Sequence, residues 1–134
     1  MNSTITFPPF LSFPNIISSA GIQYNASEDL TFTLLNKFVG NQYMSNTESN
    51  ISRLSSYSTT DLNILYTIKN SAYFSEIIVT AMINNIFNKE YVSNGYYYTY
   101  DDTWSDPNLI TTIEGTGYYP QAKRNILLGL TFKL

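Results

Sequence analysis

The chain has 134 residues, of which 13% are charged, and its formal net charge is −3. It contains neither cysteine nor histidine, which excludes disulfides, thiolate metal sites, Ser-His-Asp triads and most zinc sites. The negative charge disfavours nucleic acid as a partner, and we expect no enzymatic activity, no cofactor and no bound metal.

The predicted elements are five long strands in which apolar and polar residues alternate. In chain order they are expected at about residues 15–24, 30–43, 56–69, 76–88 and 121–134. Typical soluble strands have about 5 or 6 residues, whereas a tilted strand that crosses a bilayer needs about 9 to 11. The fold class predicted from these lengths is all-β, an antiparallel meander of about five membrane-crossing strands.

The connections between these strands alternate in length. Residues 25–29 and 70–75 are short turns, whereas residues 1–14, 44–55 and 89–120 are expected to be outer loops. Short turns on one side and long loops on the other are typical of outer-membrane barrels, in which the short turns are periplasmic. Aromatic residues are predicted to form girdles near the periplasmic end (Tyr24, Tyr66, Phe132) and near the opposite end (Phe38, Tyr43, Phe87).

The polar residues of the strands are expected on the opposite face from the large apolar ones. Lys37, Asp61, Asn63 and Lys69 are predicted to face a barrel interior, where they either pair with other protein groups or are solvated. The same alternation also fits a soluble β protein in which the aromatic residues form an ordinary core.

Three segments of the sequence resemble the C-terminal end of TonB-dependent outer-membrane receptors of the Bacteroidetes type. The run NNIFNKEY is similar to the NNLFDKxY run of that family and is matched at Asn84, Asn85, Phe87 and Tyr91. The segments GYYPQA (residues 117–122) and FVGNQYMSNT (residues 38–47) are the other two. The resemblance implies a chain that forms the C-terminal portion, 1–134, of a transmembrane β-barrel with about 22 strands and a plug domain.

The resemblance also implies partners and a location in the bacterial outer membrane. The terminal strand carries a signal for the barrel-assembly machinery, here Gly129, Phe132 and Leu134, with leucine where phenylalanine or tryptophan is commoner. The implied partners are outer-membrane lipid, this machinery, the remaining strands and plug of the receptor, and TonB, which contacts the N-terminal part missing from the chain. Such a receptor imports a scarce solute, an iron chelate, cobalamin or a glycan, and a fragment alone would not transport it.

The loop at 89–120 contains the candidate ligand contacts, because aromatic side chains in an outer loop can stack on a solute. These candidates are Tyr96, Tyr98, Tyr100, Trp104, Asp101 and Asp102. The simpler interpretation is that they pack against neighbouring loops and that the acidic residues are solvated. Two alternative functions stay open: a soluble β-sheet module whose tyrosine-rich loops bind sugars, and a small complete barrel.

Overall fold

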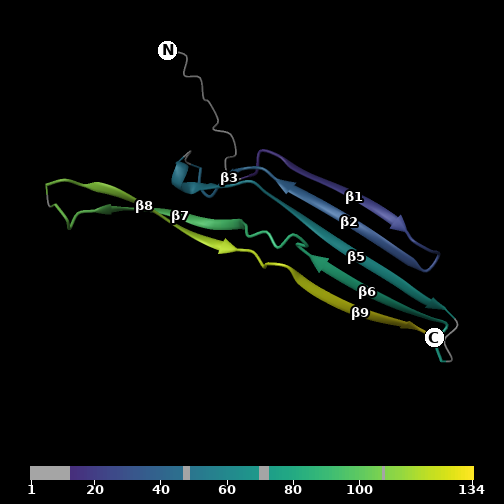
Figure 1. Cartoon of the computed structure of the whole chain (residues 1–134). Coiled ribbons are helices and arrows are strands. Elements are labelled where there is room, and N and C mark those ends of the chain that lie inside the picture. Colours follow the sequence, from purple (N-terminus) through teal and green to yellow (C-terminus); the bar gives the residue numbers. More distant parts are fainter. Residues whose placement is uncertain (1–12, 47–48, 70–72, 107) are drawn as a thin grey trace, which may run out of the picture. The chain divides into compact units, whose positions relative to one another are not determined.

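The computed structural model describes residues 13–46, 49–69, 73–106 and 108–134 (Figure 1). The chain divides into two compact units, which are described separately. The first unit comprises residues 1–16, 39–56 and 91–121, and the second comprises residues 17–38, 57–90 and 122–134. Apart from the short 3-10 helix η1 (Asn50–Ser52), the regular elements of the described residues are all β-strands.

The second unit is one antiparallel sheet of five strands. Its strands are β1 (Ile17–Asn25), β2 (Leu30–Val39), β5 (Tyr57–Lys69), β6 (Glu76–Asn84) and β9 (Asn125–Lys133). They lie in the sheet in the same order as in the chain. The predicted all-β meander of five long strands is therefore confirmed. Strands β1 and β9 form the two edges and do not pair with each other, so this sheet is open.

The predicted strand ends are displaced where the backbone leaves the sheet. Strand β2 was expected to reach residue 43 but ends at Val39, and just beyond it the N–H of Gly40 donates to the carbonyl of Ile16 at 2.8 Å. At the next residue the side-chain Oδ1 of Asn41 accepts a hydrogen bond from the N–H of Ser56. Tyr43 belongs instead to the two-residue strand β3 (Gln42–Tyr43), which pairs with β4 (Arg53–Leu54).

Strands β6 and β9 are also shorter than expected, for a related reason. Strand β6 ends at Asn84 because Asn85 adopts a left-handed backbone conformation with φ 52°. Strand β9 begins at Asn125 and not at residue 121, since the N–H of Gln121 pairs with the carbonyl of Tyr91 in the first unit. The predicted loop at 1–14 lies outside the described residues except for residues 13 and 14.

The first unit contains a long antiparallel hairpin where a loop was predicted. Strands β7 (Val92–Asp102) and β8 (Thr111–Pro120) pair from Val92↔Pro120 to Asp102↔Thr111, with a bulge between Val92 and Asn94. The segment predicted as an outer loop at 89–120 is therefore a paired hairpin for most of its length. The predicted loop at 44–55 likewise contains η1 and β4.

Buried apolar side chains are scarce throughout the described residues. Val39 and Leu54 are the buried hydrophobic residues there, and both belong to the first unit. Buried polar residues are Ser52, Thr60 and Asn85. The five-stranded sheet thus has no hydrophobic core of its own among the described residues, although a soluble sheet normally buries one face.

Candidate functional site

The register of the sheet places large apolar side chains from adjacent strands on one face. Directly opposed residues in an antiparallel pair project to the same side, and alternate residues project to opposite sides. The resulting apolar face consists of Leu62, Ile64, Tyr66 and Ile68 on β5, Ile77, Val79, Ala81 and Ile83 on β6, and Ile126, Leu128, Leu130 and Phe132 on β9. The edge strand is the most open, since Leu128 is 79% exposed.

The opposite face, called the polar face below, mixes small and polar residues with a few apolar ones. It carries Asn63, Leu65, Thr67 and Lys69 on β5, Glu76, Ile78, Thr80, Met82 and Asn84 on β6, and Asn125, Leu127, Gly129, Thr131 and Lys133 on β9. Lys37 and Asp61 line a groove together with Gly21 and Leu35. Because Asp61 is two residues before Asn63, this groove belongs to the polar face. The four residues predicted to share one face therefore do so.

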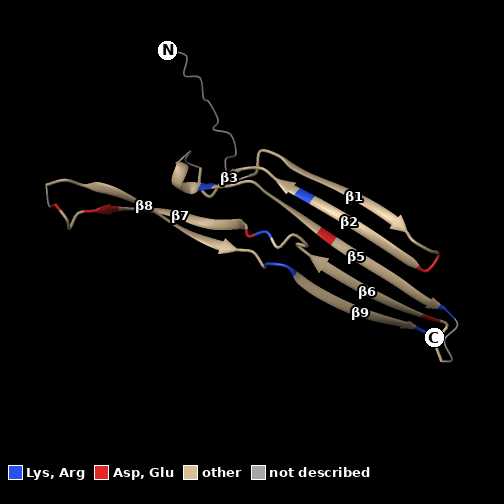
Figure 2. Ribbon diagram, viewed as in Figure 1, with Lys and Arg blue, Asp and Glu red and all other residues tan. Residues whose placement is uncertain are grey.

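The polar face ends in a row of alternating charges at the Glu76 end of the sheet (Figure 2). The Nζ of Lys69 lies 2.6 Å from a carboxylate oxygen of Asp29. The Nζ of Lys133 lies 2.5 Å from a carboxylate oxygen of Glu76. Lys69 and Glu76 are themselves opposed in the ladder between β5 and β6. Opposite charges on adjacent strands favour the register that aligns them, although solvent screens these exposed pairs. The row could not be predicted, because the register that aligns it is not visible in the sequence.

Aromatic residues flank the apolar face at the Glu76 end. Tyr66 and Phe132 lie on that face, and the ring of Phe132 contacts Phe74, with 4.9 Å between ring centroids. Tyr24 is on β1 next to the turn and is 65% exposed. At the Asn84 end the predicted girdle is less regular: Phe87 follows β6 in a turn, and Tyr43 belongs to the other unit.

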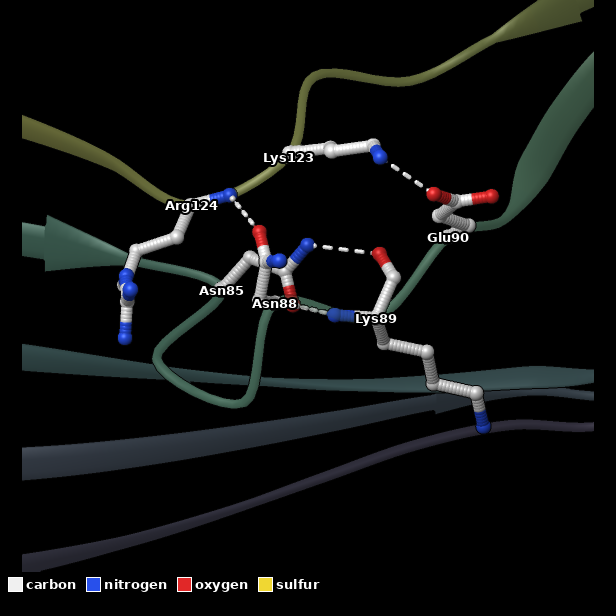
Figure 3. Close-up of polar contacts among 6 residues, drawn as sticks. All are labelled: Asn85, Asn88, Lys89, Glu90, Lys123 and Arg124. Carbon is white, nitrogen blue, oxygen red and sulfur yellow. Dashed lines mark hydrogen bonds and ion pairs between the residues drawn. The ribbon is translucent and has the colours of Figure 1, made fainter.

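The turn that follows β6 is organised by Asn85 (Figure 3). Its side-chain Nδ2 donates to the carbonyl of Lys89 at 2.8 Å, and its Oδ1 accepts from the N–H of the same residue at 2.9 Å. Its own N–H donates to the Asp61 carboxylate at 2.8 Å. Asn88 also has a positive φ, 53°, and accepts a hydrogen bond from the N–H of Arg124. Asparagine tolerates this conformation and forms local hydrogen bonds, so Asn85 fixes the backbone at the end of β6.

An ion pair lies beside this turn, between Glu90 and Lys123 (Figure 3). The hydrogen bond from Lys123, followed by its positive charge, lowers the pKa of Glu90. Both side chains are well exposed, so solvent screens the interaction and its contribution to stability is small.

The other predicted motif residues occupy different environments. The Nδ2 of Asn84 donates to the Oδ1 of Asn125 across the β6–β9 pair, at 2.9 Å. Gly129 is opposite Thr80 on the polar face, Phe132 is on the apolar face, and Leu134 follows the end of β9 with 99% of its surface exposed. These residues do not form a single site.

Three predicted ligand contacts are brought together on the hairpin. Tyr96, Tyr98 and Tyr100 lie on one face of β7, with ring centroids 6.2 and 6.4 Å apart and interplanar angles of 24° and 16°. The ring of Tyr119, from β8, lies 6.0 Å from that of Tyr96. These four residues are called the tyrosine ladder. Each of its rings is about half exposed.

Two glycines on β8 make room for this ladder. Tyr98 is opposite Gly115 and Tyr96 is opposite Gly117. A Cβ atom at either glycine would lie 2.3 Å from the facing tyrosine ring. The rings therefore reach across the pair of strands and lie over the glycine backbone, an arrangement in which an aromatic side chain covers an otherwise bare position.

Asp102 occupies the end of the ladder face. It is two residues beyond Tyr100 and accepts hydrogen bonds from the Ser105 hydroxyl at 2.6 Å and the Trp104 N–H at 2.9 Å. The Ser105 hydroxyl, followed by the N–H groups of Trp104 and Ser105, lowers the pKa of Asp102. The Trp104 side chain is 93% exposed. Asp101 projects from the other face, where it accepts a hydrogen bond from Thr112, so the two predicted carboxylates are not brought together.

The second face of the hairpin is covered by the chain itself. Glu114 accepts hydrogen bonds there from the Tyr97 hydroxyl at 2.5 Å and from the Ser49 hydroxyl at 3.2 Å. A Cβ atom at Gly95 would lie 2.4 Å from the sulfur of Met44. Met44 and Ser49 therefore contact this face, and the tyrosine ladder is on the other one. The alternation Tyr96-x-Tyr98-x-Tyr100 and Gly115-x-Gly117 was the sequence signal that could have predicted the hairpin.

Comparisons with known proteins give no match: no family model, no curated protein and no solved structure matches this chain. In the described part of the chain, no group of three or more acidic side chains is placed to hold a metal ion. Among the same residues, no helix has the length and apolar character needed to cross a membrane. The features that point to a function are the two faces of the sheet and the tyrosine ladder of the hairpin.

Proposed function

We propose that the chain forms part of the wall of an outer-membrane β-barrel, as the C-terminal portion of a TonB-dependent receptor with about 22 strands. The observation that carries this proposal is the apolar face, whose side chains from three strands point to one side and have no covering layer among the described residues. Lipid hydrocarbon would cover such a face. The intact receptor would take up a scarce solute, and the chain alone would not transport it.

The lengths of the strands support this assignment. Strands β1, β6 and β9 have 9 residues each, β2 has 10 and β5 has 13. At about 3.4 Å per residue and a tilt of about 40°, nine residues span a height of about 23 Å. The apolar band of outer-membrane barrels is about 25 Å tall.

The polar face supports the assignment of an interior. Thr80 on β6 and Gly129 and Thr131 on β9 are small or polar residues on this face. The Oδ1 of Asn63 is buried without a hydrogen-bond partner among the described residues. Water or a plug segment against this face would supply the missing donor, since buried polar atoms are normally paired.

The two edges of the sheet explain the proposed need for further strands. Strands β1 and β9 each have one unpaired side, and every unpaired backbone group in lipid costs several kcal/mol. The remaining strands of the receptor would pair with these edges. The barrel-assembly machinery would recognise Gly129, Phe132 and Leu134 at one of them. TonB would contact a part of the receptor outside this chain.

A matched pair of charge substitutions on β6 tests the orientation of the sheet. Val79→Arg places a charge on the apolar face, where a bilayer near its midplane would oppose it by about 2–4 kcal/mol. Thr80→Arg places the same charge one residue away, on the polar face, and should cost at most about 1 kcal/mol. Urea unfolding of the chain folded into lipid vesicles measures both.

The alternative of a soluble sugar-binding module makes the opposite prediction. The apolar face of such a module would be shielded from water by other parts of the protein. The chain would then be a monodisperse monomer in the absence of detergent. Fractionation of cells that express the chain separates the two functions. Recovery from membranes only with detergent supports the receptor wall, whereas recovery as a soluble monomer contradicts it.

A further inference from the structure

The tyrosine ladder and Asp102 form one continuous surface on the hairpin. Tyr96, Tyr98, Tyr100 and Asp102 are successive alternate residues of β7 and therefore project from one face. The partner strand contributes Tyr119, two glycines and Ile113 to this face, and none of these carries a charge. A row of half-exposed aromatic rings thus ends at a carboxylate.

The charges that the hairpin itself carries all have the same sign. Residues 91–120 contain four carboxylates and neither lysine nor arginine. On the hairpin, Figure 2 accordingly shows acidic positions and no basic ones. The four are Asp101, Asp102, Asp106 and Glu114. Their combined field attracts cations and repels anions at the ladder.

We propose that the tyrosine ladder binds an elongated organic cation, a linear polyamine in chemical class. Aromatic faces attract ammonium groups within about 6 Å of the ring centroid. Because neighbouring rings lie 6.2 and 6.4 Å apart, one ammonium group can lie within that distance of two rings. A linear chain of ammonium groups can follow the row of rings and place its last charge at Asp102.

The geometry of Asp102 suits the terminal position of this site. Its carboxylate is oriented by the Ser105 hydroxyl and by two backbone N–H groups of the tip, and these bonds favour its ionised form. The inference rests on the proposed function in one respect, namely that the hairpin lies outside the cell, where it meets a solute. Binding itself is measured on the purified chain and does not require a membrane orientation.

Trp104 provides the means to measure binding, because it is the single tryptophan and its backbone N–H donates to the Asp102 carboxylate. Spermine is titrated into the full chain in detergent micelles, with far-UV circular dichroism to establish the strand content. We expect a saturable change in Trp104 fluorescence that weakens as salt is added. Citrate, an anion, and maltotetraose, a neutral sugar, should give no saturable change.

Two substitutions of Tyr98 separate the aromatic ring from the hydroxyl. Tyr98→Leu removes the aromatic face and should weaken spermine binding by about 10-fold. Tyr98→Phe keeps the ring and should bind within about 2-fold of the original chain. Asp102→Asn should weaken binding and reduce its salt dependence.

Three results would overturn this inference. They are the absence of a saturable response to spermine, unchanged affinity in Tyr98→Leu, and tighter binding of maltotetraose than of spermine. None of them bears on the sheet, whose orientation is tested by Val79→Arg and Thr80→Arg. Failure of that pair would remove the membrane role and leave the binding result unaffected.

Discussion

Asn85 shows how one residue determines where a strand ends. It combines a left-handed backbone, φ 52°, with two side-chain hydrogen bonds to the backbone of Lys89. It is also 4% exposed, so its amide must find partners within the protein. Strand β6 stops at Asn84 because no ladder continues through this conformation.

Substitutions of Asn85 separate its two contributions. Asn85→Ala loses both side-chain hydrogen bonds and places alanine in the left-handed region, with an expected cost of about 3 kcal/mol. Asn85→Gly loses the same hydrogen bonds but accepts the backbone conformation, with an expected cost of about 2 kcal/mol. Urea unfolding of the chain in vesicles measures the difference. Equal costs would show that the backbone conformation contributes little.

Glu90 should give the neighbouring segment a dependence on pH. Its pKa is lowered by the hydrogen bond from Lys123 and then by its charge, so the folded chain binds the proton less tightly than the unfolded chain does. The ion pair therefore stabilises the fold above the ordinary glutamate pKa of about 4.3 and is lost as the pH falls through and below that value.

The substitution Glu90→Gln isolates this effect. The urea midpoint of the variant should lie below that of the original chain at pH 7, and the two should coincide at pH 3. Because both partners are exposed, the difference at pH 7 should be small and should shrink in high salt. A difference that persists at pH 3 would assign the contribution of Glu90 to packing and not to charge.

At the scale of elements, the sequence predicted the five strands of the sheet and missed the hairpin. Alternation of apolar and polar residues is a local signal. It located β1, β2, β5, β6 and β9 because each of these strands has one mainly apolar face and one mainly polar face. The hairpin contains Asn-Gly, Asp-Asp and Ser-Asp-Pro segments that are typical of loops. Its pairing depends on a register between β7 and β8 that only the folded chain defines.

The same reason explains which of the predicted site residues lie together. Tyr96, Tyr98 and Tyr100 were selected for their residue type, and their alternate spacing places them together. Asp101 and Asp102 were selected together, but adjacent strand residues face opposite ways, so only Asp102 joins the ladder. The contribution of Gly115 and Gly117 was not predicted because it depends on cross-strand contacts.

Gly115 allows a prediction about the hairpin as an element. Gly115→Ala places a Cβ atom 2.3 Å from the Tyr98 ring, which must rotate away. We expect the near-UV circular dichroism of the tyrosines to weaken and spermine affinity to fall. Gly129→Ala is the matched control, because its Cβ would lie 3.8 Å from Thr80, an ordinary contact. An unchanged tyrosine spectrum in Gly115→Ala would contradict this account of the ladder.

At the scale of the whole molecule, the two units follow different design rules. The sheet keeps large apolar residues in register on one face, whereas the hairpin collects aromatic residues on a face that its own chain leaves open. A water-soluble protein folded around one hydrophobic core would bury both surfaces. On the proposed membrane assignment one surface would contact hydrocarbon and the other water, so each surface would have a solvent suited to its composition.

A cysteine scan of β9 tests this division over the full sheet. The chain has no cysteine, so each introduced cysteine can carry a single nitroxide label. In lipid vesicles, residues 126, 128, 130 and 132 should be accessible to oxygen, and residues 127, 129, 131 and 133 to a water-soluble nickel chelate. Labels at Val79 and Thr80 should follow Leu130 and Gly129, respectively, because these residues are opposed in the ladder. Trp104→Cys is the water-exposed control. The apolar face would not contact lipid if labels at residues 79 and 130 differed in which reagent reaches them. The same conclusion would follow if the labels on both faces were shielded from oxygen and from the nickel chelate.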